Sequence, residues 1–221
     1  MDNKNLKKIP GGLLIVFEGI DGTGKTTQLE LAHQALLKNG WDVATARNLG
    51  GTPIGEELRK VILSPLERPS ATNLYISAAI QEALIGAIED KRAQGKIILM
   101  DRGPLSLAAY EIYGSGLGES LGWPHVESGM ARLKPELTIL YTTDVKVALA
   151  RARRKSAKAD YFESQSESYF EAVAKGYEAA SSRYKQVLKV DANRPVEDVQ
   201  AETMRLISQA IKSASSASEP S

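Results

Sequence analysis

The chain has 221 residues, of which 43% are hydrophobic and 25% are charged, and its formal net charge at pH 7 is +1. Its length and composition predict one globular domain, and its near-neutral charge argues against a broad basic surface for duplex nucleic acid. The absence of cysteine excludes disulfides, thiolate zinc sites and cysteine nucleophiles. No apolar run near the N-terminus is long enough for a membrane span or a signal core, so we expect a cytoplasmic protein with no membrane or nucleic-acid partner.

Apolar runs of five or six residues alternate with helical patterns along the chain. Glycine ends two of the helical patterns, and threonine followed by proline opens another, as helix boundaries favour. In chain order, the patterns predict an N-terminal tail over 1–12, a strand over 13–17, a helix over 24–39, a strand over 41–46, helices over 52–64 and 73–94, strands over 96–100, 137–141 and 187–190, a closing helix over 195–211 and a disordered tail over 213–221.

Strands separated by helices of this length indicate a parallel sheet with helices on both faces. The near-continuous apolar character of the first and third strands fits burial on both sides of a sheet. No internal repeat and no shift in composition marks a second domain. We therefore predict an α/β three-layer sandwich with a five-stranded parallel sheet, formed by a single domain over residues 13–212.

A glycine-rich motif follows the first predicted strand directly. Gly19 and Gly24, with Lys25 and Thr26 after them, complete the pattern G-x-x-x-x-G-K-[ST]. Glycines let main-chain N–H groups surround phosphate oxygens, the lysine places a positive charge on the β- and γ-phosphates, and the threonine offers a hydroxyl to Mg²⁺. The motif therefore predicts a P-loop that binds ATP or GTP with Mg²⁺ through Gly19, Asp21, Gly22, Thr23, Gly24, Lys25, Thr26 and Thr27.

Asp101 and Arg102 follow the third predicted strand, where ligands bind in open α/β sheets. Asp101 is a candidate for holding a Mg²⁺-bound water, and the Arg102 guanidinium suits paired hydrogen bonds to an acceptor phosphate. The alternative interpretation is a helix-capping aspartate and a surface arginine. The residues themselves leave both interpretations open.

A basic segment over residues 151–162 is a candidate lid. It carries five basic residues in the eight from 151 to 158. Position 22 of the phosphate loop is glycine, so the loop supplies no arginine to the transferring phosphoryl group. A closing lid would bring positive charge to that group where water is excluded. The alternative is a solvated basic face with no catalytic role.

Four segments, in this order, resemble the thymidylate kinase family over about residues 13–210. They are Phe-Glu-Gly-Ile-Asp-Gly-Thr-Gly-Lys-Thr-Thr-Gln at 17–28, Arg-Asn-Leu-Gly-Gly-Thr at 47–52, Asp-Arg-Gly-Pro-Leu-Ser-Leu-Ala-Ala-Tyr at 101–110, and Asp-Ala at 191–192. The resemblance implies a P-loop nucleoside monophosphate kinase that uses ATP and Mg²⁺ to phosphorylate dTMP. It also implies a homodimer packed through helices, with which the apolar stretch Leu74 to Ile88 is compatible.

The resemblance implies roles for particular residues. Asp21 would contact the acceptor sugar, and Tyr110 would pack against the deoxyribose. Asp191 and Ala192 would border adenine, and Thr26 with Asp101 would serve the metal. The implied catalytic residues are Lys25, Asp21, Arg102, Arg153 and Arg154. The implied acceptor-binding residues are Asp21, Arg47, Ile76, Ile80, Arg102, Ser106 and Tyr110.

Ile76 and Ile80 stand where we align the family's aromatic and arginine residues, which stack on thymine and hydrogen-bond its carbonyl. A related kinase with another nucleotide-like acceptor, and a nucleotide-binding paralogue without kinase activity, therefore remain alternatives. Elsewhere we expect His125 to lie in a loop over 114–129. The aromatic pattern from Glu167 to Tyr177 is interpreted as a helix with an apolar stripe rather than as part of a site.

Overall fold

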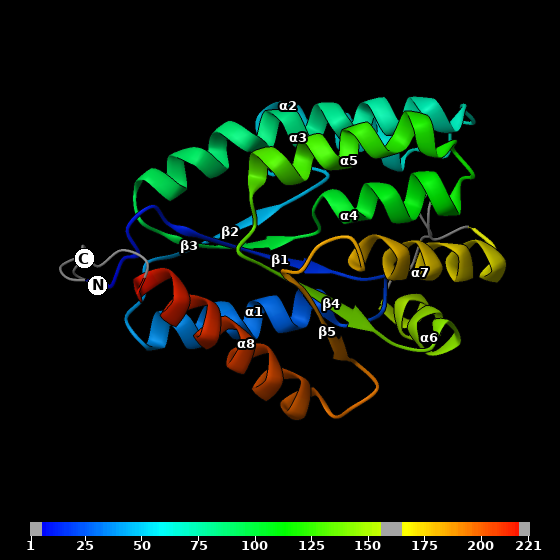
Figure 1. Cartoon of the computed structure of the whole chain (residues 1–221). Coiled ribbons are helices and arrows are strands. Elements are labelled where there is room, and N and C mark those ends of the chain that lie inside the picture. The colour runs from blue at the N-terminus through cyan, green and yellow to red at the C-terminus, as the bar shows by residue number, and fades with distance from the viewer. Residues whose placement is uncertain (1–5, 156–164, 217–221) are drawn as a thin grey trace.

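A five-stranded parallel sheet forms the centre of the computed structural model, which describes residues 6–155 and 165–216 (Figure 1). The strands follow the order β2-β3-β1-β4-β5. Their bounds are β1 (Leu13–Glu18), β2 (Val43–Arg47), β3 (Ile97–Asp101), β4 (Leu137–Thr142) and β5 (Val187–Asp191). Every neighbouring pair is parallel, so the carboxyl ends of the strands meet at one edge of the sheet. This confirms the predicted fold.

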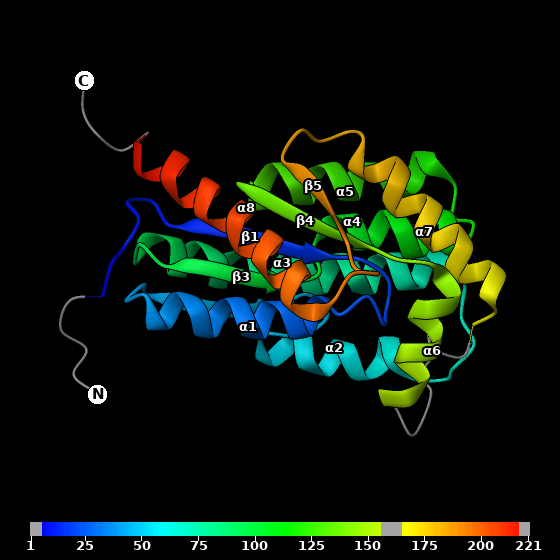
Figure 2. The ribbon, with the colours of Figure 1, turned by 90° about the horizontal axis from the view of Figure 1, so that it is seen from below.

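Helices cover both faces of the sheet. Helices α1 and α8 lie on one face, in front of the strands in Figure 2, while α3, α4 and α5 lie on the other (Figure 1). The helices are α1 (Lys25–Lys38), α2 (Pro53–Leu63), α3 (Ser70–Ala93), α4 (Pro104–Leu107), the π-helix η1 (Ala108–Gly114), α5 (Glu119–Leu133), α6 (Val145–Lys155), α7 (Glu167–Ser181) and α8 (Val196–Ser216). Across the described ranges, no helix has the length and apolar character needed to cross a bilayer.

The central strand β1 shows why the sheet has helices on both faces. Leu13, Ile15 and Phe17 pack with residues of α1 and α8, whereas Leu14 and Val16 pack with residues of α3. All five side chains are buried, because successive residues of a strand point to opposite faces. An uninterrupted apolar run is therefore what this position requires.

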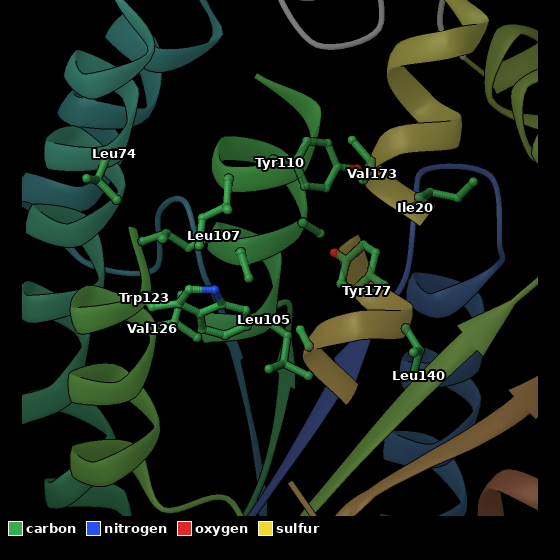
Figure 3. Close-up of a cluster of buried hydrophobic side chains, with 14 of the residues drawn as sticks. Ile20, Leu74, Leu105, Leu107, Tyr110, Trp123, Val126, Leu140, Val173 and Tyr177 are labelled. Atoms are coloured by element: carbon green, nitrogen blue, oxygen red, sulfur yellow. The ribbon is translucent and has the colours of Figure 1, made fainter. Parts of the chain in front are cut away.

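A third apolar cluster lies beyond the carboxyl edge of the sheet. It joins α4, η1, α5 and α7 through side chains that include Leu107, Tyr110, Trp123, Val173 and Tyr177 (Figure 3). Helix α4 follows β3 directly and continues into η1, so this packing fixes the segment that extends beyond the end of β3. The cluster thereby positions the side chains of the candidate site.

Three differences from the expected elements concern the core and the two ends of the chain. The segment expected as a loop over 114–129 contains most of α5, because buried Trp123, Val126 and Met130 supply a core-facing stripe despite Pro124 in the helix. Helix α8 continues to Ser216, so four residues of the expected disordered tail are helical. Within the expected N-terminal tail, Ile9 is fully buried in the core.

Candidate active site

The loop between β1 and α1 has the backbone form that encloses a phosphate group. Gly22 and Gly24 have φ angles of 86° and 88°, in the left-handed region that glycine adopts without strain. Gly24 is also the N-cap of α1. Thr23 stabilises the loop internally, since its hydroxyl donates to the carbonyl of Ile20 at 2.9 Å. The loop thus leads into a helix N-terminus, where main-chain N–H groups favour anions.

Lys25 is held inside the site by Asp21. The Lys25 ammonium donates to Asp21 Oδ1 at 3.0 Å, and the lysine is 5% exposed. Burial and the nearby Arg102 cation lower the pKa of Lys25. Burial alone would raise the pKa of Asp21, but Arg102 and Lys25 together hold it well below its ordinary value. Asp21 therefore stays ionised and holds two cations.

Thr26 and Asp101 meet across the carboxyl edge of the sheet. The Thr26 hydroxyl donates to Asp101 Oδ2 at 3.0 Å. The other carboxylate oxygen, Asp101 Oδ1, is buried and has no hydrogen-bond partner among the described residues. A hydroxyl and a carboxylate with an unsatisfied oxygen fit Mg²⁺, which takes one or two protein oxygens and completes its shell with phosphates and water. No larger cluster of metal-binding side chains lies within residues 6–155 and 165–216.

Arg102 is a largely enclosed component of the site, which excludes the surface-arginine alternative. Its side chain is 12% exposed, and its backbone has a φ of 64°. One terminal nitrogen donates to Asp21 Oδ1 at 2.6 Å and to the Tyr110 hydroxyl at 3.0 Å, and the other donates to the Tyr177 hydroxyl at 3.0 Å. The guanidinium also lies 4.9 Å from the centre of the Tyr110 ring. Its orientation is therefore fixed before any ligand binds.

A buried carboxyl group supports Arg102 from behind. Glu18 is fully buried and accepts hydrogen bonds from the Gly103 and Ser106 amides, the Ser106 hydroxyl at 2.6 Å and the Tyr177 hydroxyl at 3.1 Å. Burial raises the pKa of Glu18. The interpretation of Tyr177 as only part of an apolar stripe was incomplete. Its ring packs in the core, as Figure 3 shows, while its hydroxyl belongs to the polar network.

A cavity of about 330 Å³ opens beside these groups. Its wall includes Lys25 and Thr26 from the phosphate loop, Arg102 after β3, and Ser77 and Gln81 from α3. Ser77 and Gln81 line the cavity, whereas the sequence predicted that Ile76 and Ile80 would do so.

Ile76 and Ile80, the residues expected to meet the acceptor base, do not line this cavity. Ile80 is fully buried in the apolar cluster, and Ile76 packs against that cluster. One step along a helix turns a side chain by about 100°. Ser77 and Gln81 therefore face the cavity in their place, as neighbours one turn apart.

The π-helix η1 adds two consecutive residues to the wall, Tyr110 and Glu111. Both are buried. Burial raises the pKa of Glu111 to about 7, although the Ser115 hydroxyl and the positive charge of Arg68 oppose this change. Short π-helical turns often occur at functional sites. The proximity of Glu111 to Tyr110 in the sequence was the only available sign of its position.

Arg47 and Ser106, both expected to bind the acceptor, line the cavity. Arg47 stands at the exposed mouth and pairs with Glu56 at 2.8 Å. Asn48, the next residue, is buried. Its side-chain oxygen accepts a hydrogen bond from the Leu49 main-chain amide at 3.0 Å. The structure thus gathers most of the predicted acceptor residues around one space.

The candidate lid begins on α6, of which Arg153 and Arg154 are exposed and do not line the cavity. Residues 156–162 of the predicted lid lie outside the described residues. Helix α6 contacts the phosphate loop, since a Cβ atom at position 22 would collide with the carbonyl of Ala148. Arg151 donates to the carbonyl of Ala192 at 3.0 Å, which places it against the turn predicted to border adenine. Sequence reasoning assigned Arg151 no role of its own.

Comparison with known proteins gives one consistent result. A family model described as thymidylate kinase matches residues 17–203. A thymidylate kinase of Symbiobacterium thermophilum is 34% identical over 203 residues, covering 90% of this chain and 94% of the relative. One of Nostoc punctiforme is 37% identical over 195 residues, covering 86% and 92%. The crystal structure of thymidylate kinase from Ehrlichia chaffeensis has a TM-score of 0.72 and 23% identity, covers 90% of this chain and 100% of that chain, and is similar in fold.

Proposed function

The chain belongs to the thymidylate kinase family, and we propose that its cavity transfers the γ-phosphoryl group of ATP to dTMP, giving ADP and dTDP. One observation carries the assignment to this cavity. A phosphate loop with buried Lys25 and the fixed guanidinium of Arg102 open into the same space, from the ends of the neighbouring strands β1 and β3. Two phosphate groups held by these cations lie side by side, as phosphoryl transfer requires.

The chain's own residues act by position and charge. The amides of the phosphate loop and Lys25 hold the β- and γ-phosphates of ATP, while Arg102 and Arg47 hold the phosphate of dTMP. An oxygen of that phosphate bonds to the γ-phosphorus as the bond to the bridging oxygen breaks, and ADP leaves. Asp21 keeps Lys25 and Arg102 in place through hydrogen bonds of 3.0 and 2.6 Å. No side chain becomes covalently modified.

Magnesium is the metal that the donor set supports. When bound with ATP, Mg²⁺ neutralises charge on the β- and γ-phosphates. The Thr26 hydroxyl would contact the ion, and the unpartnered oxygen of Asp101 would accept from a water bound to it. Arg153 or Arg154 supplies positive charge to the transferring group when the lid closes. Asp191 and Ala192 border the adenine.

A homodimer, which the family resemblance implies, remains a proposal. Leu74, Leu84 and Ile88, which belong to the apolar stretch that was compatible with an interface, are buried in the core of the chain itself. Sedimentation equilibrium across a range of protein concentrations would measure the oligomeric state directly.

The function is tested by separating nucleotides after incubation of the purified full chain with ATP, Mg²⁺ and dTMP. We expect dTDP and ADP to form in equal amounts, and ADP formation to depend on dTMP. Lys25→Ala serves as the inactive control. ADP release at the same rate with and without dTMP, with no dTDP formed, would refute the proposal.

A further inference from the structure

Gln81 is a buried polar residue of α3 that lines the cavity. It is 6% exposed, and its side-chain oxygen has no hydrogen-bond partner among the described residues. The amide packs over Gly129 of α5, where an added Cβ would collide with it. Because Gly129 has no side chain, the Gln81 amide fits against α5. A buried amide oxygen without a hydrogen-bond partner costs free energy unless a ligand supplies a donor.

The place of Gln81 in the cavity indicates which part of the acceptor it meets. The acceptor phosphate must lie near the cations of the phosphate loop and of Arg102, at the edge of the sheet. The uncharged base then extends toward α3, whose Ser77 and Gln81 line the cavity. Leu63 and Leu107 complete an apolar surround for the ring. The base edge therefore comes to the Gln81 amide.

A primary amide both accepts and donates, and a half-turn of its terminal group exchanges the two roles. Thymine offers an N3 donor beside an O4 acceptor, so the amide forms two hydrogen bonds with it. Cytosine offers an N3 acceptor beside an N4 donor, and the turned amide again forms two. At the 4-position of the base, a guanidinium, which only donates, can donate to O4 of thymine but meets another donor in the 4-amino group of cytosine.

We propose that Gln81 binds the base edge of the acceptor and that the site therefore phosphorylates 4-aminopyrimidine nucleotides such as dCMP as well as dTMP. This inference rests on the proposed function. The reaction is unchanged: an oxygen of the dCMP phosphate bonds to the γ-phosphorus of ATP, and ADP leaves.

The experiment compares kcat/KM for dTMP and dCMP with the full chain at saturating ATP and Mg²⁺. We expect the two values to lie within about 100-fold of each other, because a site that hydrogen-bonds only one partner rejects the other by about 10⁴-fold or more. Gln81→Arg should lower the dCMP-to-dTMP ratio by at least about tenfold. Gln34→Arg, the same change on the exposed surface of α1, should leave the ratio as it is.

The outcomes separate the inference from the function. Turnover of dTMP with dCMP rejected by about 10⁴-fold or more would overturn the inference alone. So would an unchanged ratio in a folded Gln81→Arg variant. Failure to phosphorylate dTMP would overturn the proposed function itself. The wild-type comparison needs no variant, so it decides the question even if Gln81→Arg does not fold.

Discussion

Replacing the Glu111 carboxyl should change the free energy of unfolding in a pH-dependent way. Compared with wild type, the variant gains stability as the pH rises from acid to neutral. In the unfolded chain this group titrates near its ordinary pKa of 4.5, whereas burial raises the folded pKa to about 7. Between these values the folded protein keeps a proton that the unfolded chain releases. Folding stability from this group is therefore fully present below about pH 4.5 and is lost as the pH rises to 7. Such a difference in pKa corresponds to about 3 kcal/mol.

Glu111→Gln keeps the size of the side chain and removes its titration. We expect the unfolding free energy of the variant, minus that of wild type, to rise by about 3 kcal/mol between pH 4.5 and pH 8. Urea denaturation followed by tryptophan fluorescence at several pH values measures this difference, with equal m-values checked at each pH. Glu171→Gln on the exposed face of α7 is the matched control. A difference that stays constant with pH would refute the reasoning.

Three further predictions concern the site. Lys25→Ala should lower kcat about 100- to 1000-fold, since a fixed charge is lost from a dry site, and near-normal turnover would remove its assigned role. Arg102→Ala should raise KM for dTMP at least about tenfold with little effect on KM for ATP, and the opposite pattern in steady-state kinetics would move the phosphate clamp elsewhere. Asp101→Asn should raise the Mg²⁺ concentration for half-maximal rate about tenfold, and an unshifted Mg²⁺ titration would contradict its placement.

The sheet and phosphate loop could be predicted because their signals are local and strong. A short apolar run such as Leu13 to Phe17 is typical of a buried strand. The loop motif requires particular residue types at fixed spacing. Helix boundaries shifted by only a few residues. Helix α3, for example, begins at Ser70 rather than near residue 73.

The cavity wall could not be predicted so well, because it depends on one rotation of α3. This helix buries Leu74, Ile80, Leu84 and Ile85 around much of its circumference, so its apolar pattern does not indicate a single inner face. The sequence pattern therefore could not show that Gln81, rather than Ile80, lines the cavity. The polar role of Tyr177 was not predicted for a related reason. Its ring belongs to the apolar stripe of the helix, and only the packed structure shows that its hydroxyl contacts Arg102 and Glu18.

The contact between Gly22 and the Ala148 carbonyl has a consequence for how this enzyme can evolve. An arginine cannot be introduced into the phosphate loop at position 22 by one substitution, because α6 occupies the space its first carbon needs. Helix α6 would have to move first. A side chain at position 22 would therefore require a compensating change in α6, so two substitutions rather than one separate this chain from a variant with a loop arginine.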